Sequence, residues 1–350
     1  MNETQLKKIN GSKPFVSLLV PMHNEAEFIL ECLTSIQNQN YPKESYEVLV
    51  FDGESTDASR EIVENFLNNL TIGRLASNPK RIQAAAWNMG IQESSGEIIG
   101  IVSAHSVLGP DYVTNIIETL IRTGADMVGG PTIADSAGLV GEAIAIALNS
   151  PFGVGNAQFH YTNKEIEVDS VFMGACWRKT YEKIGGFDEE LIRNQDDEFS
   201  YRLRKAGGKI ICNPKIRSRY FNRSSLIGLF KQYFQYGFYK VRVLQKHPRQ
   251  MSPRQFVPPL FVLSLVIAIL QTILANWGWV ILAAVAGSYL IANFAASLVS
   301  AAKKGWRHLS LLPVVFATLH CSYGLGFLAG LIKFWNRWGD KTGKVPPINK

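Results

Sequence analysis

The chain carries the sequence YEVLVFDGESTD at residues 46–57, and this stretch indicates the fold. Its first half is a short, largely apolar run that has the length of a buried strand. Asp52 stands where this strand is expected to end. A polar loop follows, in which Asp57 is a candidate cap for a helical pattern over 58–68.

Strand-like and helical patterns also alternate on both sides of this stretch. Apolar runs at 15–20, 97–102 and 125–129 have strand length, and residues 25–37 show helical spacing of their apolar side chains. Strands that alternate with helices predict an α/β fold, with a mostly parallel sheet flanked by helices. Ligands of such sheets bind at the carboxyl ends of the strands.

The loops expected at these carboxyl ends carry polar side chains that suit a nucleotide. The first strand leads into Pro21, His23 and Glu25, and the second leads into Asp52. Neither loop is a glycine-rich phosphate loop, which argues against a dinucleotide or P-loop site. Carboxylates suit hydrogen bonds to the N–H edge of a base and to ribose hydroxyls. A plain turn is the alternative interpretation of Asp52.

A second polar cluster, RNQDDE, occupies residues 193–198. It lies between a Gly-Gly-Phe-Asp turn at 185–188 and a basic segment at 201–205. Carboxylates beside guanidinium groups suit proton abstraction next to a bound anion. The alternative is a solvated, charge-rich start of a helix.

The apolar residues of this 350-residue chain gather toward its C-terminal part. Residues 256–300 are nearly free of charge, which fits two membrane-spanning helices of about 20 residues each. A third candidate runs over 309–332, but His320 and several glycines interrupt it, so a span and a re-entrant element both fit. A buried core helix in a soluble protein is the alternative for all three segments.

Charge and targeting signals suggest a place in the cell. Residues 1–13 lack the apolar core of a secretory signal, so we expect the N-terminal portion in the cytosol. Basic residues typical of a cytoplasmic flank precede the first apolar segment, at Lys240, Arg242, Lys246, Arg249 and Arg254. The net charge of +7 suits anionic lipid and a diphosphate ligand better than nucleic acid. The four cysteines have no paired spacing, so neither zinc nor disulfides are expected.

The motifs at 16–25 and 48–57 resemble the start of a family 2 glycosyltransferase. Further motifs in that family's order and spacing occupy 172–178, 185–188, 196–198 and 201–203. The resemblance covers roughly the first two thirds of the chain and implies a GT-A fold, with a sheet that binds a nucleotide-sugar and a half that binds the acceptor. The apolar tail, together with 232–237, resembles the subgroup of succinoglycan-type polysaccharide glucosyltransferases.

This resemblance implies roles for the donor-side residues. Asp52 would hold the base of the nucleotide, which is expected to be uridine diphosphate, and Pro21, His23 and Glu25 would line the same pocket. The family's two metal-binding aspartates should fall at Ser103 and His105, and neither aspartate is present. His105 is therefore the candidate ligand for Mn²⁺ or Mg²⁺, since a neutral imidazole can bind a divalent ion. Ser103 stays a donor-site candidate.

The resemblance also implies roles on the acceptor side. Asp196 would be the general base that takes the proton of the acceptor hydroxyl, and inversion at the anomeric carbon follows from the family. Arg202 would steady this carboxylate or the departing diphosphate, with a surface salt bridge as the alternative. Asp197, Gln232 and Tyr236 are further candidates for the acceptor and diphosphate region. Gln195 stands where the family commonly has glutamate.

Together with the apolar segments, this resemblance implies an inverting glycosyltransferase at the cytoplasmic face of the cell membrane, which moves a sugar from a nucleotide-sugar to a lipid-linked or polysaccharide acceptor. The alternative is a catalytically weak or inactive membrane-bound module that binds a nucleotide or a partner enzyme. Residues 138–161 are expected as a mobile connection. The expected parts are a catalytic domain, an amphipathic interfacial segment, two to three transmembrane helices and a basic tail, at 1–225, 226–255, 256–335 and 336–350.

Overall fold

The computed structural model describes residues 13–68, 72–131, 133–135, 138–155, 162–275 and 277–348. The chain divides into two compact units. The first unit contains Met1–Ile133, Gln158–Phe221 and Gly343–Lys350, and the second contains Ala134–Ala157 and Asn222–Thr342. The chain therefore passes from one unit to the other after residues 133, 157, 221 and 342.

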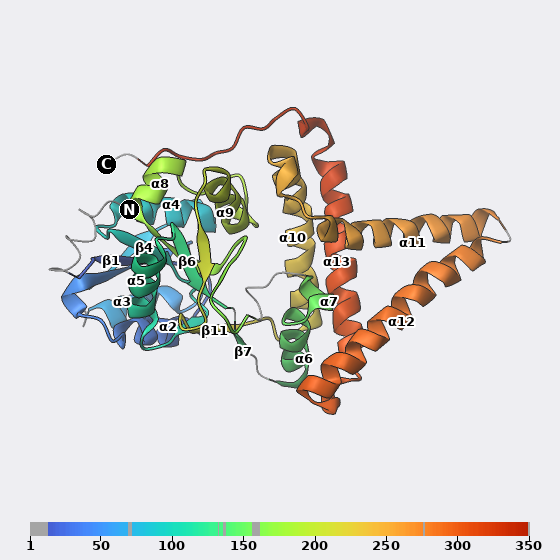
Figure 1. The fold of residues 1–350 in the computed structure, drawn as a ribbon, viewed down its shortest axis with the longest axis horizontal. Helices are drawn as coiled ribbons and strands as arrows, with labels where there is room; N and C mark the ends of the chain where they lie inside the picture. The colour runs from blue at the N-terminus through green and yellow to red at the C-terminus, as the bar shows by residue number, and fades with distance from the viewer. Residues whose placement is uncertain are drawn as a thin grey trace. The chain divides into compact units, whose positions relative to one another are not determined.

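Within its described residues, the first unit is built on an eight-stranded sheet with the order β3-β2-β1-β4-β9-β6-β10-β8 (Figure 1). Strand β1 is parallel to both β2 and β4, and β3 extends the parallel set beside β2. Strand β9 is antiparallel to both β4 and β6. The predicted mostly parallel sheet is confirmed. The strands are β1 Val16–Met22, β2 Tyr46–Asp52, β3 Gly73–Ser77, β4 Ile98–Ile101, β6 Met127–Gly130, β8 Ile166–Glu167, β9 Phe172–Trp177 and β10 Ile210–Cys212.

Helices cover both faces of this sheet because successive side chains of a strand point to opposite faces. Leu18 of β1 belongs to one buried cluster and Leu19 to the other. The Leu18 cluster holds apolar side chains of α2, α3 and α5, and the Leu19 cluster holds those of α4, α8 and α9. These helices are α2 Ile29–Gln37, α3 Ser59–Leu67, α4 Gln83–Glu93, α5 Tyr112–Thr123, α8 Arg178–Ile184 and α9 Gln195–Lys205.

Within the described residues, a second and smaller sheet has the strand order β5-β11-β7. Its strands are β5 Ser106–Leu108, β7 Ile133–Asp135 and β11 Ser218–Phe221. Strands β5 and β11 are antiparallel, and Tyr220 is paired with Ser106. This pairing brings the aromatic side chain of Tyr220 next to the loop that follows β4.

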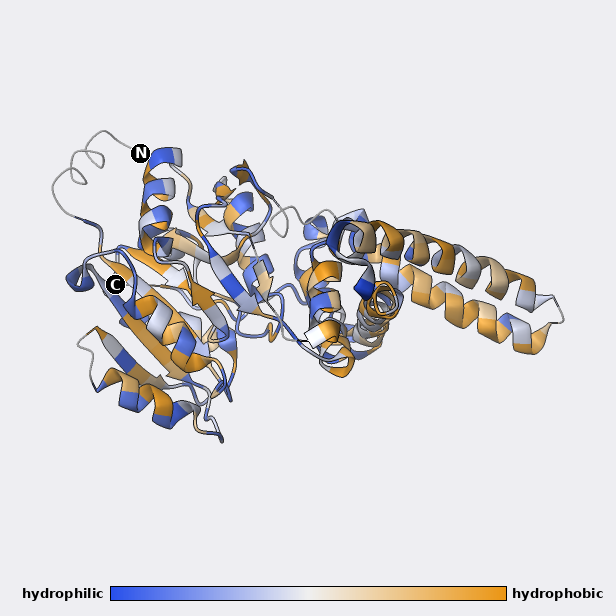
Figure 2. Ribbon diagram, turned by 90° about the horizontal axis from the view of Figure 1, so that it is seen from below, coloured by the Kyte–Doolittle hydropathy of each residue, from blue (hydrophilic) through white to orange (hydrophobic). Residues whose placement is uncertain are grey.

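The second unit is helical. Among the described residues, three helices are long and apolar enough to cross a membrane: Pro253–Leu274, Gly278–Lys304 and Leu312–Lys333. The third apolar segment therefore has the length and composition of a span. Figure 2 shows apolar residues along most of the first two helices. The helices of this unit are α6 Gly138–Leu148, α7 Pro151–Val154, α10 Leu226–Lys246, α11 Val257–Leu274, α12 Gly278–Lys304 and α13 Leu312–Lys333. Short 3₁₀ turns occur at Lys43–Ser45, Pro248–Gln250, Pro253–Phe256, Trp306–His308 and Trp335–Arg337.

Glycines allow α10 and α13 to pack closely along one another. A Cβ atom at Gly237 would lie 2.1 Å from the carbonyl oxygen of Tyr323, and one at Gly326 would lie 2.0 Å from that of Phe234. Real Cβ atoms do not approach backbone so closely, so both positions require glycine. Small residues at helix crossings are typical of packing inside membranes.

The segment 138–161, expected as a mobile connection, contains helices α6 and α7 in its described part. Ile144 of α6 is buried in a cluster with Phe316 of α13. The carbonyl oxygen of Phe152 lies 2.9 Å from Nε2 of His320. That expectation is wrong because alanine and isoleucine side chains bury against the long helices, while residues 156–161 lie outside the described residues.

Candidate active site

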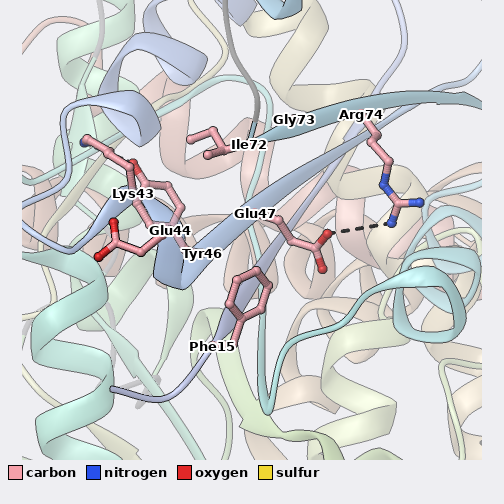
Figure 3. Close-up of a pocket in the computed structure, with 8 residues that line it drawn as sticks. All are labelled: Phe15, Lys43, Glu44, Tyr46, Glu47, Ile72, Gly73 and Arg74. Carbon is pink, nitrogen blue, oxygen red and sulfur yellow. Dashed lines mark hydrogen bonds and ion pairs between the residues drawn. The ribbon is translucent and has the colours of Figure 1, made fainter. Parts of the chain in front are cut away.

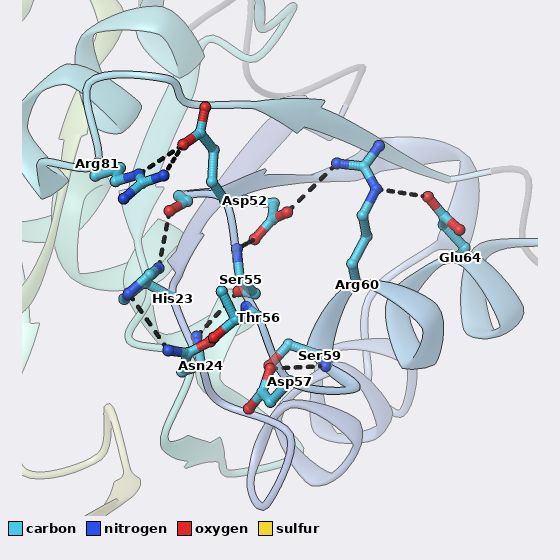
Figure 4. A network of polar contacts seen from close by, with 12 residues as sticks. His23, Asn24, Asp52, Ser55, Thr56, Asp57, Ser59, Arg60, Glu64 and Arg81 are labelled. Carbon is cyan, nitrogen blue, oxygen red and sulfur yellow. Dashed lines mark hydrogen bonds and ion pairs between the residues drawn. The ribbon is translucent and has the colours of Figure 1, made fainter.

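The loops at the ends of β1 and β2 lie side by side because these strands are parallel and in register, with Met22 opposite Asp52. Asp52 is 1% exposed. One of its carboxylate oxygens accepts the N–H of Ser55 at 3.0 Å, and the other lies 3.3 Å from a guanidinium nitrogen of Arg60 (Figure 4). Two fixed donors thus hold the carboxylate at the strand end that an α/β sheet uses for ligands.

The loop after β1 is hydrogen-bonded directly to the loop after β2. Asn24 has a positive φ of 55°, and its side-chain oxygen accepts the N–H of Thr56 at 2.8 Å. Nδ1 of His23 lies 2.8 Å from the carbonyl oxygen of Gly53. Figure 4 shows these contacts as one network. The two loops therefore form a preformed polar rim, and Pro21 lies within β1 opposite Phe51.

Asp57 also belongs to this network of polar contacts. Its carboxylate accepts hydrogen bonds from the hydroxyl of Ser59, at 2.5 Å, and from the N–H groups of Ser59 and Ala26. These bonds favour the charged form, so the pKa of Asp57 lies below its usual range. Asp57 therefore ties the start of α3 to the loop after β1.

His105 follows the end of β4, and Glu25 orients its ring. Nδ1 of His105 lies 2.9 Å from Oε1 of Glu25. The ring centroids of His105 and Tyr220 are 4.9 Å apart. Because Nδ1 contacts Glu25, Nε2 is the ring nitrogen that a ligand could bind. Ser103, two residues earlier, directs its backbone N–H to the sulfur of Met173 at 3.2 Å.

This arrangement fits a metal held by a single protein nitrogen. The ring nitrogen of a metal-ligating histidine that does not bind the metal is usually hydrogen-bonded to a carboxylate or another acceptor. Nδ1 of His105 has such a contact with Glu25. Among the described residues, no group of three or more histidine, cysteine, aspartate or glutamate side chains is placed to hold an ion.

Asp196 and Asp197 lie in the first turn of α9, directly after Asn194 in a left-handed conformation with a φ of 63°. The positive end of the helix dipole favours carboxylates at this position. One carboxylate oxygen of Asp196 accepts the N–H of Asp197 at 2.9 Å. Asp196 is half-buried, and the bond to Asp197 holds one of its carboxylate oxygens at the start of α9.

The structure pairs Arg202 with Glu198 and with the Gly-Gly-Phe-Asp turn. Two guanidinium nitrogens lie 2.7 and 3.0 Å from the oxygens of Glu198, which is 1% exposed. The same guanidinium donates to the carbonyl oxygens of Ile184 and Gly186, both at 2.6 Å. Glu198 was not among the predicted site residues, although its spacing of four residues from Arg202 is the signal of a helical ion pair.

Gln232 and Tyr236 belong to α10 of the second unit. The side-chain amide of Gln232 donates to the hydroxyl of Tyr236 at 3.1 Å, as expected for residues one helical turn apart. The ring of Tyr236 also lies 5.4 Å from that of Tyr233. These side chains form a polar and aromatic stretch on one helix.

A cavity of about 310 Å³ in the first unit lies away from all of these residues (Figure 3). It is lined at the amino ends of the parallel strands, by Phe15, Lys43, Glu44, Tyr46, Glu47, Ile72, Gly73 and Arg74. The polar loops described above occupy the opposite, carboxyl edge. This cavity is therefore separate from the candidate active site.

An α/β unit with polar loops at the carboxyl ends of β1, β2 and β4, in one chain with three apolar helices of membrane length, is the architecture of membrane-associated glycosyltransferases with a GT-A fold. The chain belongs to glycosyl transferase family 2, whose sequence profile matches residues 17–185. It is a glycosyltransferase.

Two relatives align with nearly the whole chain. The dolichyl N-acetyl-alpha-D-glucosaminyl phosphate 3-beta-D-2,3-diacetamido-2,3-dideoxy-beta-D-glucuronosyltransferase of Methanococcus voltae is 30% identical, covering 91% of this chain and 98% of its own length. The succinoglycan biosynthesis protein ExoA of Rhizobium meliloti is 29% identical, covering 91% of this chain and 96% of its own length.

A solved structure shares the fold. The mannosyltransferase of Pyrobaculum calidifontis, in complex with GDP-mannose and Mn²⁺, superimposes with a TM-score of 0.59 at 20% identity. The superposition covers 92% of this chain and 88% of that one. A neighbour with the GT-A fold thus holds a nucleotide-sugar together with a divalent ion.

Proposed function

We propose that this glycosyltransferase moves a sugar from a nucleotide-linked donor, with uridine diphosphate as carrier, to a lipid-linked acceptor, with inversion at the anomeric carbon. The observation that carries the proposal is the buried carboxylate of Asp52 at the end of β2, within the same unit as the half-buried carboxylate of Asp196 on α9. The first suits recognition of a base, and the second suits removal of a proton.

On the donor side, Asp52 is the residue that recognises the base. Its oxygens already accept from Ser55 and Arg60, and each keeps lone pairs for a further donor. The ring N–H of uracil is such a donor. His23 and Asn24 hold the loop after β1 against the loop after β2, so the pocket needs little rearrangement to bind.

The diphosphate lies beside His105 in this proposal. The imidazole, oriented by Glu25, would hold Mn²⁺ or Mg²⁺ through Nε2, and such an ion neutralises charge on the departing diphosphate. Ser103 offers a hydroxyl in place of a charged ligand. The site therefore depends on one imidazole where the family commonly has carboxylates.

In the transfer step, Asp196 takes the proton of the acceptor hydroxyl. The hydroxyl oxygen attacks the anomeric carbon of the donor sugar from the face opposite the leaving group. The bond from that carbon to the diphosphate oxygen breaks, and the nucleoside diphosphate leaves with the electron pair. Arg202 positions Asp196 by fixing α9 to the backbone of the turn that precedes it.

The proposed acceptor is supported by the names of two relatives and by the apolar helices of this chain. The name of the Methanococcus voltae relative describes a dolichyl phosphate-linked acceptor, and that of the Rhizobium meliloti relative describes polysaccharide biosynthesis. The apolar helices would keep the enzyme at the membrane, and nucleotide-sugars of the cytosol would reach a catalytic unit on that side. Gln232, Tyr236 and Asp197 are the residues we assign to the acceptor and diphosphate region.

A second candidate function is a nucleotide-binding module with weak or no transfer activity. It is favoured by one observation, the replacement of both expected metal-binding aspartates by Ser103 and His105. Binding of a nucleoside diphosphate without any turnover would be its signature.

The test is a transfer assay with detergent-solubilised protein, a panel of α-linked uridine and guanosine diphosphate sugars, and polyprenyl phosphate-linked sugar as acceptor. The proposal expects release of uridine diphosphate that depends on acceptor, and a β-linked glycolipid by nuclear magnetic resonance. An α-linked product would contradict inversion. Tight binding of uridine diphosphate with no product from any donor would favour the second candidate.

A further inference from the structure

The last residues of the chain return to the catalytic unit after the membrane-length helices. Residues Gly343–Lys350 belong to the first unit, and the described part, 343–348, is called the tail segment here. Figure 1 shows the C-terminal end of the chain beside α8. The tail segment contains VPPI, which has neither helical nor strand periodicity, and the structure gives it fixed partners.

The tail segment is hydrogen-bonded to the Gly-Gly-Phe-Asp turn at 185–188. Gly186 donates its N–H to the carbonyl oxygen of Pro346 at 3.1 Å, and Glu189 donates its N–H to that of Lys344 at 3.0 Å. The side chain of Asp188, 1% exposed, accepts the N–H of Lys344 at 2.8 Å. Two groups of the turn and the N–H of the residue after it therefore use the tail segment as their partner.

The tail segment also fills part of the core. Ile348 is 4% exposed and belongs to the buried cluster that contains Trp87, Tyr181 and Phe187. Burial of this apolar side chain favours the docked position of the short segment, in addition to its hydrogen bonds. Gly343 passes so close to Asp188 that a Cβ there would lie 2.8 Å from a carboxylate oxygen.

The opposite side of the same turn is fixed by α9 and α4. Arg202 of α9 donates to the carbonyl oxygens of Ile184 and Gly186. Asn88 of α4 accepts the N–H of Phe187 at 2.7 Å and donates to its carbonyl oxygen at 2.9 Å. The turn is thus held between the tail segment and the helix whose first turn carries Asp196.

We propose that the tail segment is a positioning element of the active site, which locks the Gly-Gly-Phe-Asp turn and, through Arg202, sets the place of Asp196. This inference rests on the proposed role of Asp196 as the base. A misplacement of about 1 Å at a reacting group costs up to about a hundredfold in rate, so a loose turn slows transfer without changing recognition of the base at Asp52. Loss of the tail segment is therefore expected to lower kcat.

The experiment compares the full chain with a variant that ends at Thr342, and with Ile348→Ser as a milder change. We expect kcat to fall by about tenfold or more in both, with the Kd for uridine diphosphate unchanged. A synthetic peptide of residues 341–350 should restore activity to the shortened protein. Lys344→Ala is the matched control, because Lys344 is exposed and its hydrogen bonds to Glu189 and Asp188 are made by its backbone.

Hydrogen–deuterium exchange separates this inference from the assignment of the base. Faster exchange over 185–202 in both variants, reversed by the peptide, is the expected result. Unchanged exchange and unchanged kcat in Ile348→Ser would overturn the positioning role. If exchange changes as expected but Asp196→Asn keeps full activity, the tail segment still holds the turn, and the assignment of Asp196 is the part that fails.

Discussion

Nδ1 of His105 lies 2.9 Å from Oε1 of Glu25, and the two residues are 80 positions apart in the chain. The pair connects the loop after β1 to the loop after β4, at the edge of the sheet where ligands bind. A carboxylate on one ring nitrogen fixes the orientation of the imidazole. Glu25 therefore has a role that its place in the nucleotide loop alone did not indicate.

Removal of either partner should affect the metal-dependent part of nucleotide binding. His105→Ala is expected to abolish the gain in affinity for uridine diphosphate that Mn²⁺ provides, and Glu25→Gln should reduce metal affinity by about 10–100-fold. Isothermal titration with and without Mn²⁺ measures both. Glu27→Gln, at an exposed neighbouring position, is the control. Equal binding of the nucleotide in both conditions, unaltered in His105→Ala, would indicate chemistry without a metal.

Replacement of Asp52 should weaken recognition of the base. Asp52→Asn converts a charged acceptor into an amide, and hydrogen bonds to charged groups are worth about 1.5–3 kcal/mol. We expect the binding free energy of uridine diphosphate, measured by isothermal titration, to become less favourable by that amount. Glu64→Gln is a suitable control because Glu64 contacts Arg60 from the exposed side. A wild-type affinity in Asp52→Asn would exclude Asp52 from the pocket.

The ion pair of Glu198 and Arg202 should contribute strongly to stability. Arg202→Ala leaves the buried carboxylate of Glu198 without its partner, which costs about 3–5 kcal/mol. Arg204→Ala, on the same helix, breaks the pair with exposed Asp169 and should cost about 0–1 kcal/mol. Thermal unfolding in detergent compares the two variants. Similar losses of Tm would contradict the distinction between the two pairs.

Close packing of α10 against α13 should depend on glycine. Gly326→Val places side-chain atoms where the carbonyl oxygen of Phe234 now lies, so we expect the helices to separate and Tm to fall. Gly287→Val in α12 is the matched control, since a Cβ there meets nothing within 4 Å. The same thermal scan tests both, and an equal effect at the two positions would refute the close crossing.

Much of the fold could be predicted from local patterns. The apolar runs that became β1, β2, β4 and β6 are short and buried on both faces, so their sequence carries a strong signal. The antiparallel place of β9 between β4 and β6 could not be derived, because its partners are distant in the chain. Helix α6 was expected as a loop because it is rich in glycine and alanine. Its side chains are buried in a cluster with residues of the long helices, including Phe316, and this packing is not visible in the local sequence.

The candidate site likewise contains features that the sequence predicted and contacts that it could not predict. The loops after β1 and β2 were predicted as neighbours because parallel strands end at one edge. The contact of Glu25 with His105 and the bonds of Arg202 to the Gly-Gly-Phe-Asp turn depend on tertiary structure. The tail segment lies within the basic tail expected at 336–350, which was predicted from its several basic residues. Its contacts are instead made by Ile348 and by the backbone.

The central claim is that Asp196 is the base of a transfer reaction, and its most direct test is the pair Asp196→Asn and Asp169→Asn in one transfer assay. The two changes are chemically identical, and Asp169 is exposed on the same unit, where it pairs with Arg204. We predict a loss of turnover of about 10²–10⁴-fold in Asp196→Asn, with unchanged affinity for uridine diphosphate, and full turnover in Asp169→Asn. Wild-type turnover in Asp196→Asn would contradict the account.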